Sequence, residues 1–597
     1  MPNYEHSILS SGPDVNLSTV VYYLYKAITM CYFSTELAIY TLDCPQHDRS
    51  KREDRPRYLA TESMTSSRFP RRVVEDCQQS LEMLKTIIPL AIISFLMHIP
   101  SITTSIMCVN LNSTTHQRAA RTALNASNYM GMSVLLGLVT SLECLGSQAA
   151  GAGRTRYFGL ITARTIIIGF FVSCIITTAW FYSESLLGFL PWSGPDVENL
   201  AGDMLRLYSL VLPVFCIDMS LTRYTIILGY VVEIVYVRIA AVILHGVMAY
   251  LFIFTWDKQL VGAVLALLVT EVAATIGTVA VVRYFGILTE VTDNINLTLF
   301  KGWTELLKLG LPGVVMFAAE NLLVGVTLSA LSKGEVGQYN SFLDLIIYYQ
   351  CYSHLYHGLA TAGAIITGKN LSKQDAATTK RNATLFCWFS LACGFIFALI
   401  SLVFRYQIAY FLSSSSTSLV MTSIPIFCAY LVADATQVSM SGVLIGLGKQ
   451  VVGCGIYLIT LCGVGLFATL ILVDFLDAGG SGAWLSLALG SGAALCSIWV
   501  VVVKTDWIKE SSAVKEVGAL VDKDCIEMQI LGENKDYARD ELNINPFTNE
   551  VFETVPLFNK QSASISIDTE IKITFSLFVA SFTIMIISII IYFSAMA

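Results

Sequence analysis

Two similar stretches, LKTIIPL at residues 84–90 and LKLGLPG at residues 307–313, begin two long apolar regions of the chain. The offset between them is 223 residues. A second pair of stretches, SQAAGAGR (147–154) and GKNLSKQD (368–375), has nearly the same offset of 221 residues. Self-similarity at a fixed offset indicates an internal structural repeat. We therefore expect two halves with the same number of elements in the same order.

The composition indicates a protein that crosses a membrane many times. Of the 597 residues, 55% are hydrophobic and only 14% are charged, whereas soluble domains have roughly 25% charged residues. A soluble surface built from this chain would expose large apolar patches, which argues against a soluble enzyme. The formal net charge of −7 argues against a nucleic-acid-binding protein. The 15 cysteines contain no CxxC pair, and we interpret most of them as small packing residues.

The apolar runs predict twelve membrane-spanning helices, because a spanning helix needs about 20 mostly apolar residues. The predicted helices occupy residues 84–108, 121–146, 157–183, 204–231, 235–255, 259–286, 303–331, 338–366, 383–406, 416–446, 450–475 and 481–504. We expect an all-α fold of two six-helix lobes with a pseudo-two-fold relation, an N-lobe at residues 84–290 and a C-lobe at residues 303–504. Two repeated lobes are typical of secondary transporters that bind their cargo between the halves.

The flanking segments have a different character from the two lobes. Residues 1–83 form a predicted cytoplasmic tail, and residues 505–571 form an acidic linker with 14 acidic and 6 basic residues. Residues 572–597 contain a last apolar run, which predicts a thirteenth transmembrane helix. Lysine and arginine gather in the loops after predicted helices 2, 6 and 8. The positive-inside rule then places the N-terminus and the linker in the cytoplasm and the C-terminus outside, with the plasma membrane as the expected location.

Three carboxylates inside the predicted C-lobe helices are the main candidate site residues. Glu320 lies about two turns past Pro312, Asp344 lies in the next helix, and Asp434 lies in the middle of the tenth helix. Charged side chains inside spanning helices are costly, so their presence points to function. A carboxyl in an apolar cavity binds a proton readily and releases it when a cation arrives. This chemistry favours a proton/cation antiporter, and the alternative is that each acid hydrogen-bonds a neighbouring helix.

Aromatic residues supply a second feature of an organic-cation site. Tyr349, Tyr352 and Tyr356 follow Asp344 on one helix face, and aromatic faces attract desolvated cations. The alternative interpretation of each tyrosine is helix packing. Cys351, His354 and His357 are also spaced three apart, but their directions spread over about 120° on a helix. We therefore expect no metal site, and no motif in the sequence calls for a cofactor.

The N-lobe carries charges that have more than one interpretation. Asp218 and Arg223 are five residues apart in the fourth predicted helix, and we expect them to form an internal ion pair. Glu271 in the sixth helix either provides a titrating site of the N-lobe or pairs with Arg223. Glu271 is a secondary candidate site residue, as are Tyr349, Tyr352 and Tyr356.

Several stretches resemble one known family of membrane proteins. GLVTSLECLGSQAAGAGR (137–154) closely resembles the junction of helices 2 and 3 in the MATE family, the multidrug and toxin extrusion transporters. LKLGLPGVVMFAAE (307–320) resembles the start of that family's helix 7, and residues 432–466 with 479–491 resemble its helices 10–12. The likeness covers residues 84–510, and the acidic linker with the thirteenth span resembles the animal branch.

The resemblance implies a function and places family residues on this sequence. It implies proton-coupled efflux of organic cations and xenobiotics by alternating access between two lobes, with protons favoured over sodium as the coupling ion. The family's acids fall on Glu320, Asp344 and Asp434, and the acid of the junction motif falls on Glu143. The implied partners are small organic cations, protons and the lipid bilayer, with no nucleic acid and no enzymatic activity.

The sequence also departs from the family pattern at several positions. Asn321-Leu322 replaces an aromatic pair after the helix 7 acid, Ser94 replaces a glutamine, and His245 and Ala249 replace asparagines. These changes indicate a divergent member with a shifted substrate range. Two alternatives remain: a transport-dead homologue that acts as a scaffold through the linker, and a lipid flippase. A flippase would favour basic residues in the cavity, whereas the predicted C-lobe site is acidic.

Overall fold

The computed structural model describes residues 71–111, 113–183, 195–292, 297–373, 376–412 and 417–514, and all regular structure in these residues is helical. Proline is tolerated inside three of the long helices because neighbouring helices satisfy the freed backbone groups. The N-lobe consists of α2 (Arg71–Val109), α3 (Thr114–Ser127), α4 (Ser133–Gly151), α5 (Thr155–Phe181), α7 (Pro195–Tyr208), α8 (Val211–Leu228), α9 (Val231–Tyr250) and α10 (Gln259–Tyr284).

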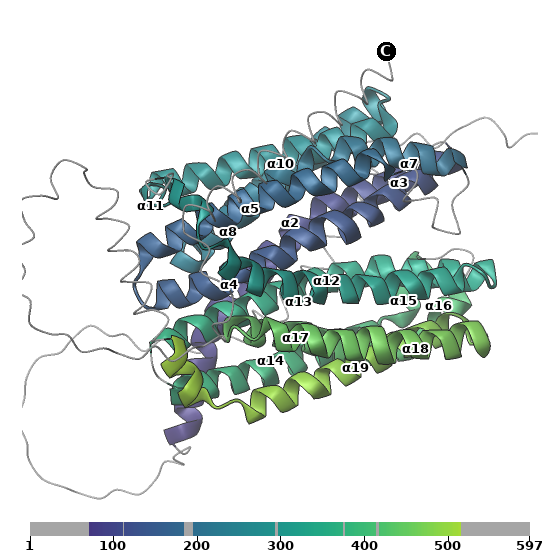
Figure 1. Cartoon of the computed structure of the whole chain (residues 1–597). Coiled ribbons are helices and arrows are strands. Elements are labelled where there is room, and N and C mark those ends of the chain that lie inside the picture. Colours follow the sequence, from purple (N-terminus) through teal and green to yellow (C-terminus); the bar gives the residue numbers. More distant parts are fainter. Residues whose placement is uncertain are drawn as a thin grey trace, which may run out of the picture.

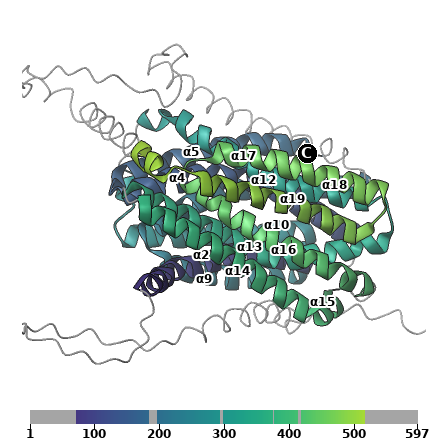
Figure 2. The ribbon, with the colours of Figure 1, turned by 90° about the horizontal axis from the view of Figure 1, so that it is seen from below.

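The C-lobe follows after the short helix α11 (Thr289–Thr292). It consists of α12 (Trp303–Leu331), α13 (Val336–Ser372), α14 (Ala376–Val403), α15 (Arg405–Leu412), α16 (Thr417–Gly446), α17 (Gln450–Tyr457), α18 (Leu466–Thr469) and α19 (Gly479–Lys504). Figure 1 shows the two lobes as separate layers of roughly aligned helices, which diverge toward the end that holds α7 and α15. Figure 2 shows α14, α16 and α19 of the C-lobe running alongside one another.

Eleven of the described helical segments are long and apolar enough to cross a membrane. Their outward faces are also apolar: Tyr236, Ile239, Ile243 and Val247 of α9 are exposed at helical spacing, as expected where lipid replaces water. α13 is also long but is not among these eleven segments, because it carries polar residues such as Gln350 along its length. The all-α, two-lobe architecture expected from the sequence is confirmed in the described residues.

Several predicted helix boundaries are wrong, and the errors share a cause. α2 begins at Arg71 and α14 at Ala376, whereas apolar runs predicted starts at residues 84 and 383. Apolar runs mark only the hydrocarbon layer, and helices continue into water when their polar ends stay hydrogen-bonded. The predicted helix at 204–231 is divided between α7 and α8, because the amphipathic α7 has a pattern unlike that of a spanning helix.

Some sequence predictions lie wholly or largely outside the described residues. The tail up to residue 70, most of the acidic linker and the thirteenth helix belong to this group. The described start of the linker is helical at residues 507–514 and packs against the C-lobe. Trp507 is buried, the Ser511 hydroxyl donates to the Leu371 carbonyl at 3.1 Å, and Glu510 pairs with Lys449 at 2.9 Å.

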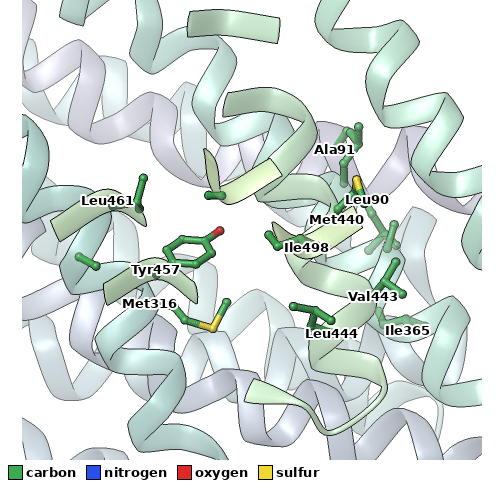
Figure 3. Packing of buried hydrophobic residues seen from close by; sticks show 14 of the residues in the cluster. Leu90, Ala91, Met316, Ile365, Met440, Val443, Leu444, Tyr457, Leu461 and Ile498 are labelled. Atoms are coloured by element: carbon green, nitrogen blue, oxygen red, sulfur yellow. The ribbon is translucent and has the colours of Figure 1, made fainter. Parts of the chain in front are cut away.

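The two lobes share a hydrophobic core at one end of the molecule. We call this the basic end, because it holds Arg154, Arg283, Lys369 and Lys504 at the ends of helices. The larger core cluster joins Leu90 and Ala91 of α2, and Leu138 of α4, to C-lobe residues that include those in Figure 3. A second cluster fills the opposite half of the N-lobe and contains no C-lobe residue. Buried apolar contact between the lobes is therefore concentrated at the basic end.

Gly358 permits a close approach between the lobes at this end. It lies in α13 where that helix crosses α2, and a Cβ added there would lie 2.5 Å from the Cα of Ala91. Small residues let helix backbones approach closely in membrane proteins. Gly358 therefore helps to set the distance between α2 and α13.

We expect Gly358→Ala to destabilise the protein, because overpacking a tight contact costs about 1–3 kcal/mol. Gly455→Ala is the matched control, since a Cβ at Gly455 in α17 meets nothing within 4 Å. Thermal unfolding of the purified proteins measures the effect. Gly358→Ala should unfold at a lower temperature than the wild type, whereas Gly455→Ala should not. Equal unfolding temperatures for the two variants would contradict this account of the lobe contact.

Candidate functional site

A cavity of about 180 Å³ lies between the two lobes. Residues of α2, α4 and α8 form its N-lobe side, and residues of α12, α13 and α16 form its C-lobe side. The charged and imidazole-bearing residues that line it are Glu143, Arg223, Glu320, His98, His354 and His357. The cavity thus lies where a repeat of two lobes predicts a binding site.

Glu320 lines the cavity from α12, as its position past Pro312 predicts. Among the described residues, no lysine or arginine forms an ion pair with its carboxylate. A carboxylate without a cationic partner in a partly dehydrated site is stabilised either by a proton or by an arriving cation. Glu320 therefore lies in an environment where a proton and a cation can compete for the same negative charge.

Asp434 lies behind the cavity wall, in α16, and is not one of the lining residues. Its carboxylate accepts a hydrogen bond of 2.6 Å from the Tyr349 hydroxyl, and longer bonds from Gln437 at 3.2 Å and Ser491 at 3.4 Å. Tyr349 itself lines the cavity, and the charges of Glu320 and Asp434 are close enough to interact. Tyr349 thus links the cavity surface to the second acid.

The remaining predicted C-lobe residues do not line the cavity. Asp344 is half-buried one turn before Tyr348. The Tyr352 hydroxyl shares a 2.7 Å hydrogen bond with that of Tyr348, and Tyr356 is fully buried. The rings of Tyr352 and Tyr356 both pack on Phe397 of α14. Only Tyr349 of the three predicted tyrosines reaches the cavity surface.

Glu143 forms an ion pair that closes the N-lobe side of the cavity. Its Oε1 atom lies 2.8 Å from Nε of Arg223 in α8 and accepts a 3.1 Å hydrogen bond from Thr361 of α13. Both members of the pair are almost completely buried. One carboxylate therefore neutralises Arg223, the arginine that lines the cavity among the described residues, and also connects the two lobes.

The predicted pairing of Asp218 with Arg223 is wrong. Asp218 pairs with Arg238 of α9 at 2.6 Å and accepts a 3.1 Å hydrogen bond from Thr278 of α10. Residues five apart on a helix point in directions about 140° apart, so Asp218 and Arg223 face different neighbours. The alternative pairing of Glu271 with Arg223 is also wrong, because Arg223 pairs with Glu143.

Glu271 lines a second, smaller pocket inside the N-lobe. The pocket shares His98, Ser101 and Asn128 with the central cavity. Among the described residues, the buried Oε1 atom of Glu271 has no hydrogen-bond partner. This carboxyl therefore remains a candidate for a titrating site of the N-lobe.

Sequence reasoning missed the imidazole cluster in the cavity wall. His98 of α2 stacks on His354 of α13, with ring centroids 3.6 Å apart and planes 9° from parallel. His357 lies one turn further along α13 and stacks on Phe317 of α12 at 5.3 Å. The spacing of His354 and His357 was visible in the sequence, but nothing in the sequence indicates that His98 meets them.

We expect Glu143→Gln to destabilise the protein by about 3–5 kcal/mol, because it leaves the buried Arg223 charge without a partner. The double variant Glu143→Gln/Arg223→Gln removes both charges and should recover part of that loss. The yield and unfolding temperature of the purified proteins measure both effects. The account of the ion pair is contradicted when the double variant is less stable than Glu143→Gln alone.

Comparison with known proteins places the chain in a family. The sequence model of the MatE family matches residues 89–251 and 313–471, which are the two repeats. Protein DETOXIFICATION 49 of Arabidopsis thaliana is 24% identical over 75% of this chain and 90% of its own length. Multidrug and toxin extrusion protein 1 of Homo sapiens is 23% identical over 69% of this chain and 72% of its own length.

Solved structures agree on the fold. The eukaryotic MATE transporter AtDTX14 superposes with a TM-score of 0.70 at 19% identity, covering 74% of this chain and 99% of that structure. The bent form of the Vibrio cholerae MATE transporter VcmN gives a TM-score of 0.63 at 17% identity, covering 74% of this chain and 99% of that structure. The family model covers more than half of the sequence, and its two matched ranges fall one in each lobe. The chain therefore belongs to the MatE family of multi-pass membrane transporters.

Proposed function

We propose that the protein exports organic cations and xenobiotics in exchange for protons, with Glu320 as the residue at which the two compete. The observation that carries this proposal is the Glu320 carboxylate, which lines the cavity between the lobes without an ion-pair partner among the described residues. A proton and a substrate cation neutralise the same charge, so binding of one favours release of the other.

The balance of charge in the cavity supports a cationic substrate. Arg223 is the cavity's lining arginine, and Glu143 pairs with it at 2.8 Å. Glu320 then gives the lining a net negative charge while the imidazoles are neutral. Tyr349 adds an aromatic face beside this charge, and its hydroxyl donates to Asp434. We propose that Glu320 and Tyr349 contact the cation, and that Asp434 tunes them from behind.

The other candidate residues have supporting roles in this proposal. Tyr352 and Tyr356 pack within the C-lobe and hold α13 against α14. Asp344, outside the cavity lining, acts through the position of α13. Glu271 is a second titrating group on the N-lobe side.

The distribution of contacts between the lobes supports alternating access. The shared core closes the basic end, and the lobes diverge toward the opposite end. We propose that this arrangement is the outward-open state and that the lobes rock about the cavity. By the positive-inside rule the basic end is cytoplasmic, and the plasma membrane is the proposed location.

We expect Glu320→Gln to reduce the initial rate of pH-driven uptake of a fluorescent quaternary ammonium dye into proteoliposomes by about tenfold or more, since the amide neither binds a proton nor attracts the cation. Glu335→Gln is the matched control, because Glu335 is an exposed acid before α13 whose side chain caps nothing. Its rate should equal that of the wild type.

Three results of this assay would count against the proposal. Normal transport by Glu320→Gln would remove the coupling role of this residue. Dye binding without movement under either a pH or a sodium gradient would favour a transport-dead scaffold. Absence of dye binding, together with binding of anionic lipids, would favour a flippase.

The proposed orientation makes a separate prediction. Asn112-Ser113-Thr114 is a glycosylation sequon just before α3, and Asn370-Leu371-Ser372 is a sequon at the basic end. We expect a glycan on Asn112 alone of these two when the chain is made in glycosylating cells, because sequons are modified on the non-cytoplasmic side. Asn112→Gln should remove a mobility shift on gels, and Asn370→Gln should not. A glycan on Asn370 and none on Asn112 would contradict the proposed orientation and place the basic end outside the cytoplasm.

A further inference from the structure

The stacked pair His98–His354 crosses the boundary between the lobes. His98 belongs to α2 and His354 to α13, and these two helices pack together at the lobe interface. Both residues also line the cavity, and both are half-buried. The pair therefore lies where the open cavity ends and the closed contact of the basic end begins.

Hydrogen bonding determines where each ring accepts a proton. Nδ1 of His98 lies 2.8 Å from the Ser94 carbonyl oxygen. Since a carbonyl only accepts, Nδ1 must carry the hydrogen, and the lone pair is on Nε2. Nδ1 of His354 has no hydrogen-bond partner among the described residues, although it is buried. Each ring therefore has one nitrogen that no backbone group of its own helix holds in a hydrogen bond. That nitrogen, Nε2 of His98 or Nδ1 of His354, is available to accept a proton.

The geometry of the stack limits the charge that it holds. Two parallel imidazoles 3.6 Å apart tolerate no more than one positive charge between them, because two like charges at this distance repel strongly in a poorly hydrated site. Separation of α2 from α13 would hydrate both rings and remove this restriction. By linkage, the state in which the rings separate binds more protons than the stacked state.

We propose that His98 and His354 form a second proton-binding site, which acts as a latch: protonation through the cavity breaks the stack and favours separation of the lobes at the basic end. This proposal deepens the proposed function and rests on it. The proton from cavity water bonds to a ring nitrogen lone pair, and it leaves on the other side once the lobes have rocked. In an outward-open state, protons that enter from outside would thus promote return to the inward-open state.

The charged groups around the pair are consistent with this assignment. Arg223 of α8 and Arg238 of α9 are paired with Glu143 and Asp218, so neither is an unbalanced cation. His245 of α9 is held between Thr104 and Thr270 by two 3.0 Å hydrogen bonds and does not line the cavity. Among the described residues, the other titratable groups facing the cavity or its side pocket are Glu320 of α12, Glu271 of α10, Tyr129, Tyr208, Tyr349, Tyr457 and His357.

The chain contains its own reporter for opening at the basic end. Cys144 of α4 is 1% exposed and packs with Ala364 of α13 and Ile445 of α16, across the lobe boundary. Separation of the lobes would expose this thiol. Cys387 is buried within the C-lobe and should stay protected. Labelling of the denatured protein at each pH normalises the reactivity of the reagent.

The test measures alkylation of Cys144 by N-ethylmaleimide, quantified by peptide mass spectrometry on the full chain in nanodiscs without substrate or gradient. The wild type, His98→Phe and His354→Phe are compared at the same pH, between about pH 8 and pH 5.5, the range in which histidine changes charge. Phenylalanine keeps an aromatic stack and cannot bind a proton. His357→Phe is the matched control, because that ring stacks on Phe317 within the same lobe.

We expect normalised Cys144 labelling to rise by about tenfold or more at low pH in the wild type and in His357→Phe. It should stay at its high-pH level in both stack variants. The latch would be overturned if Cys144 labelling in His98→Phe and His354→Phe rose at low pH as much as in the wild type. It would also be overturned if labelling of the wild type did not respond to pH. Loss of the response in Glu320→Gln, with retention in the stack variants, would assign the sensor to Glu320 instead. This measurement does not depend on dye transport. Failure of the antiport proposal, which the dye-uptake assay tests, can therefore be distinguished from failure of the latch.

Discussion

The packing of α2 and α4 against α13 at the basic end is the constraint on which the rest of the site depends. A glycine at position 358 allows the backbones of α2 and α13 to approach. This approach brings Thr361 to Glu143 and His354 to His98, each pair joining one lobe to the other. It also joins the lobes at one end by a shared apolar core, while the helices of the two lobes diverge toward the other end. Any rocking motion must break these contacts together.

The two lobes differ in how they hold charge, and the difference suggests a division of labour. In the N-lobe, Asp218 and Glu143 each pair with an arginine, so that each of these two pairs is neutral overall. In the C-lobe, Glu320 and Asp434 have no arginine or lysine partner within the described residues. Tyr349 and other neutral donors surround Asp434 instead. A proton or a cation thus changes the charge of the C-lobe far more than that of the N-lobe.

The sequence predicted the order of the long helices well, because the thickness of the bilayer dictates the length of an apolar run. Eleven of the described helices can cross a membrane, and the predicted thirteenth span lies outside the described residues. It also predicted Glu320 as a cavity residue, since the repeat and Pro312 fix its depth in α12. It did not predict helix ends such as Arg71, where polar residues continue the helix into water. It placed Asp218 with the wrong arginine, because the choice of partner depends on how α8 packs against α9.

The contacts that cross the lobes were beyond sequence reasoning for a physical reason. His98 and His354 are far apart in the chain, and no periodic pattern relates residues on different helices. Asp434 was predicted as a cavity acid, but the direction of Tyr349, which decides whether it is covered, depends on packing. The likeness to the MatE family identifies the fold and the repeat, whereas the partner of each buried charge comes from the packing of the helices.

The central claim is that a proton and a substrate cation compete for Glu320, and proton release on cation binding tests it most directly. The purified protein in weakly buffered detergent solution is mixed with a quaternary ammonium ligand, and a pH-indicator dye reports the protons released. The account predicts about half a proton released per bound cation at the pH where half the free sites are protonated, rising toward one at lower pH, and none from Glu320→Gln. Saturable cation binding by the wild type with no proton release at any pH would contradict it.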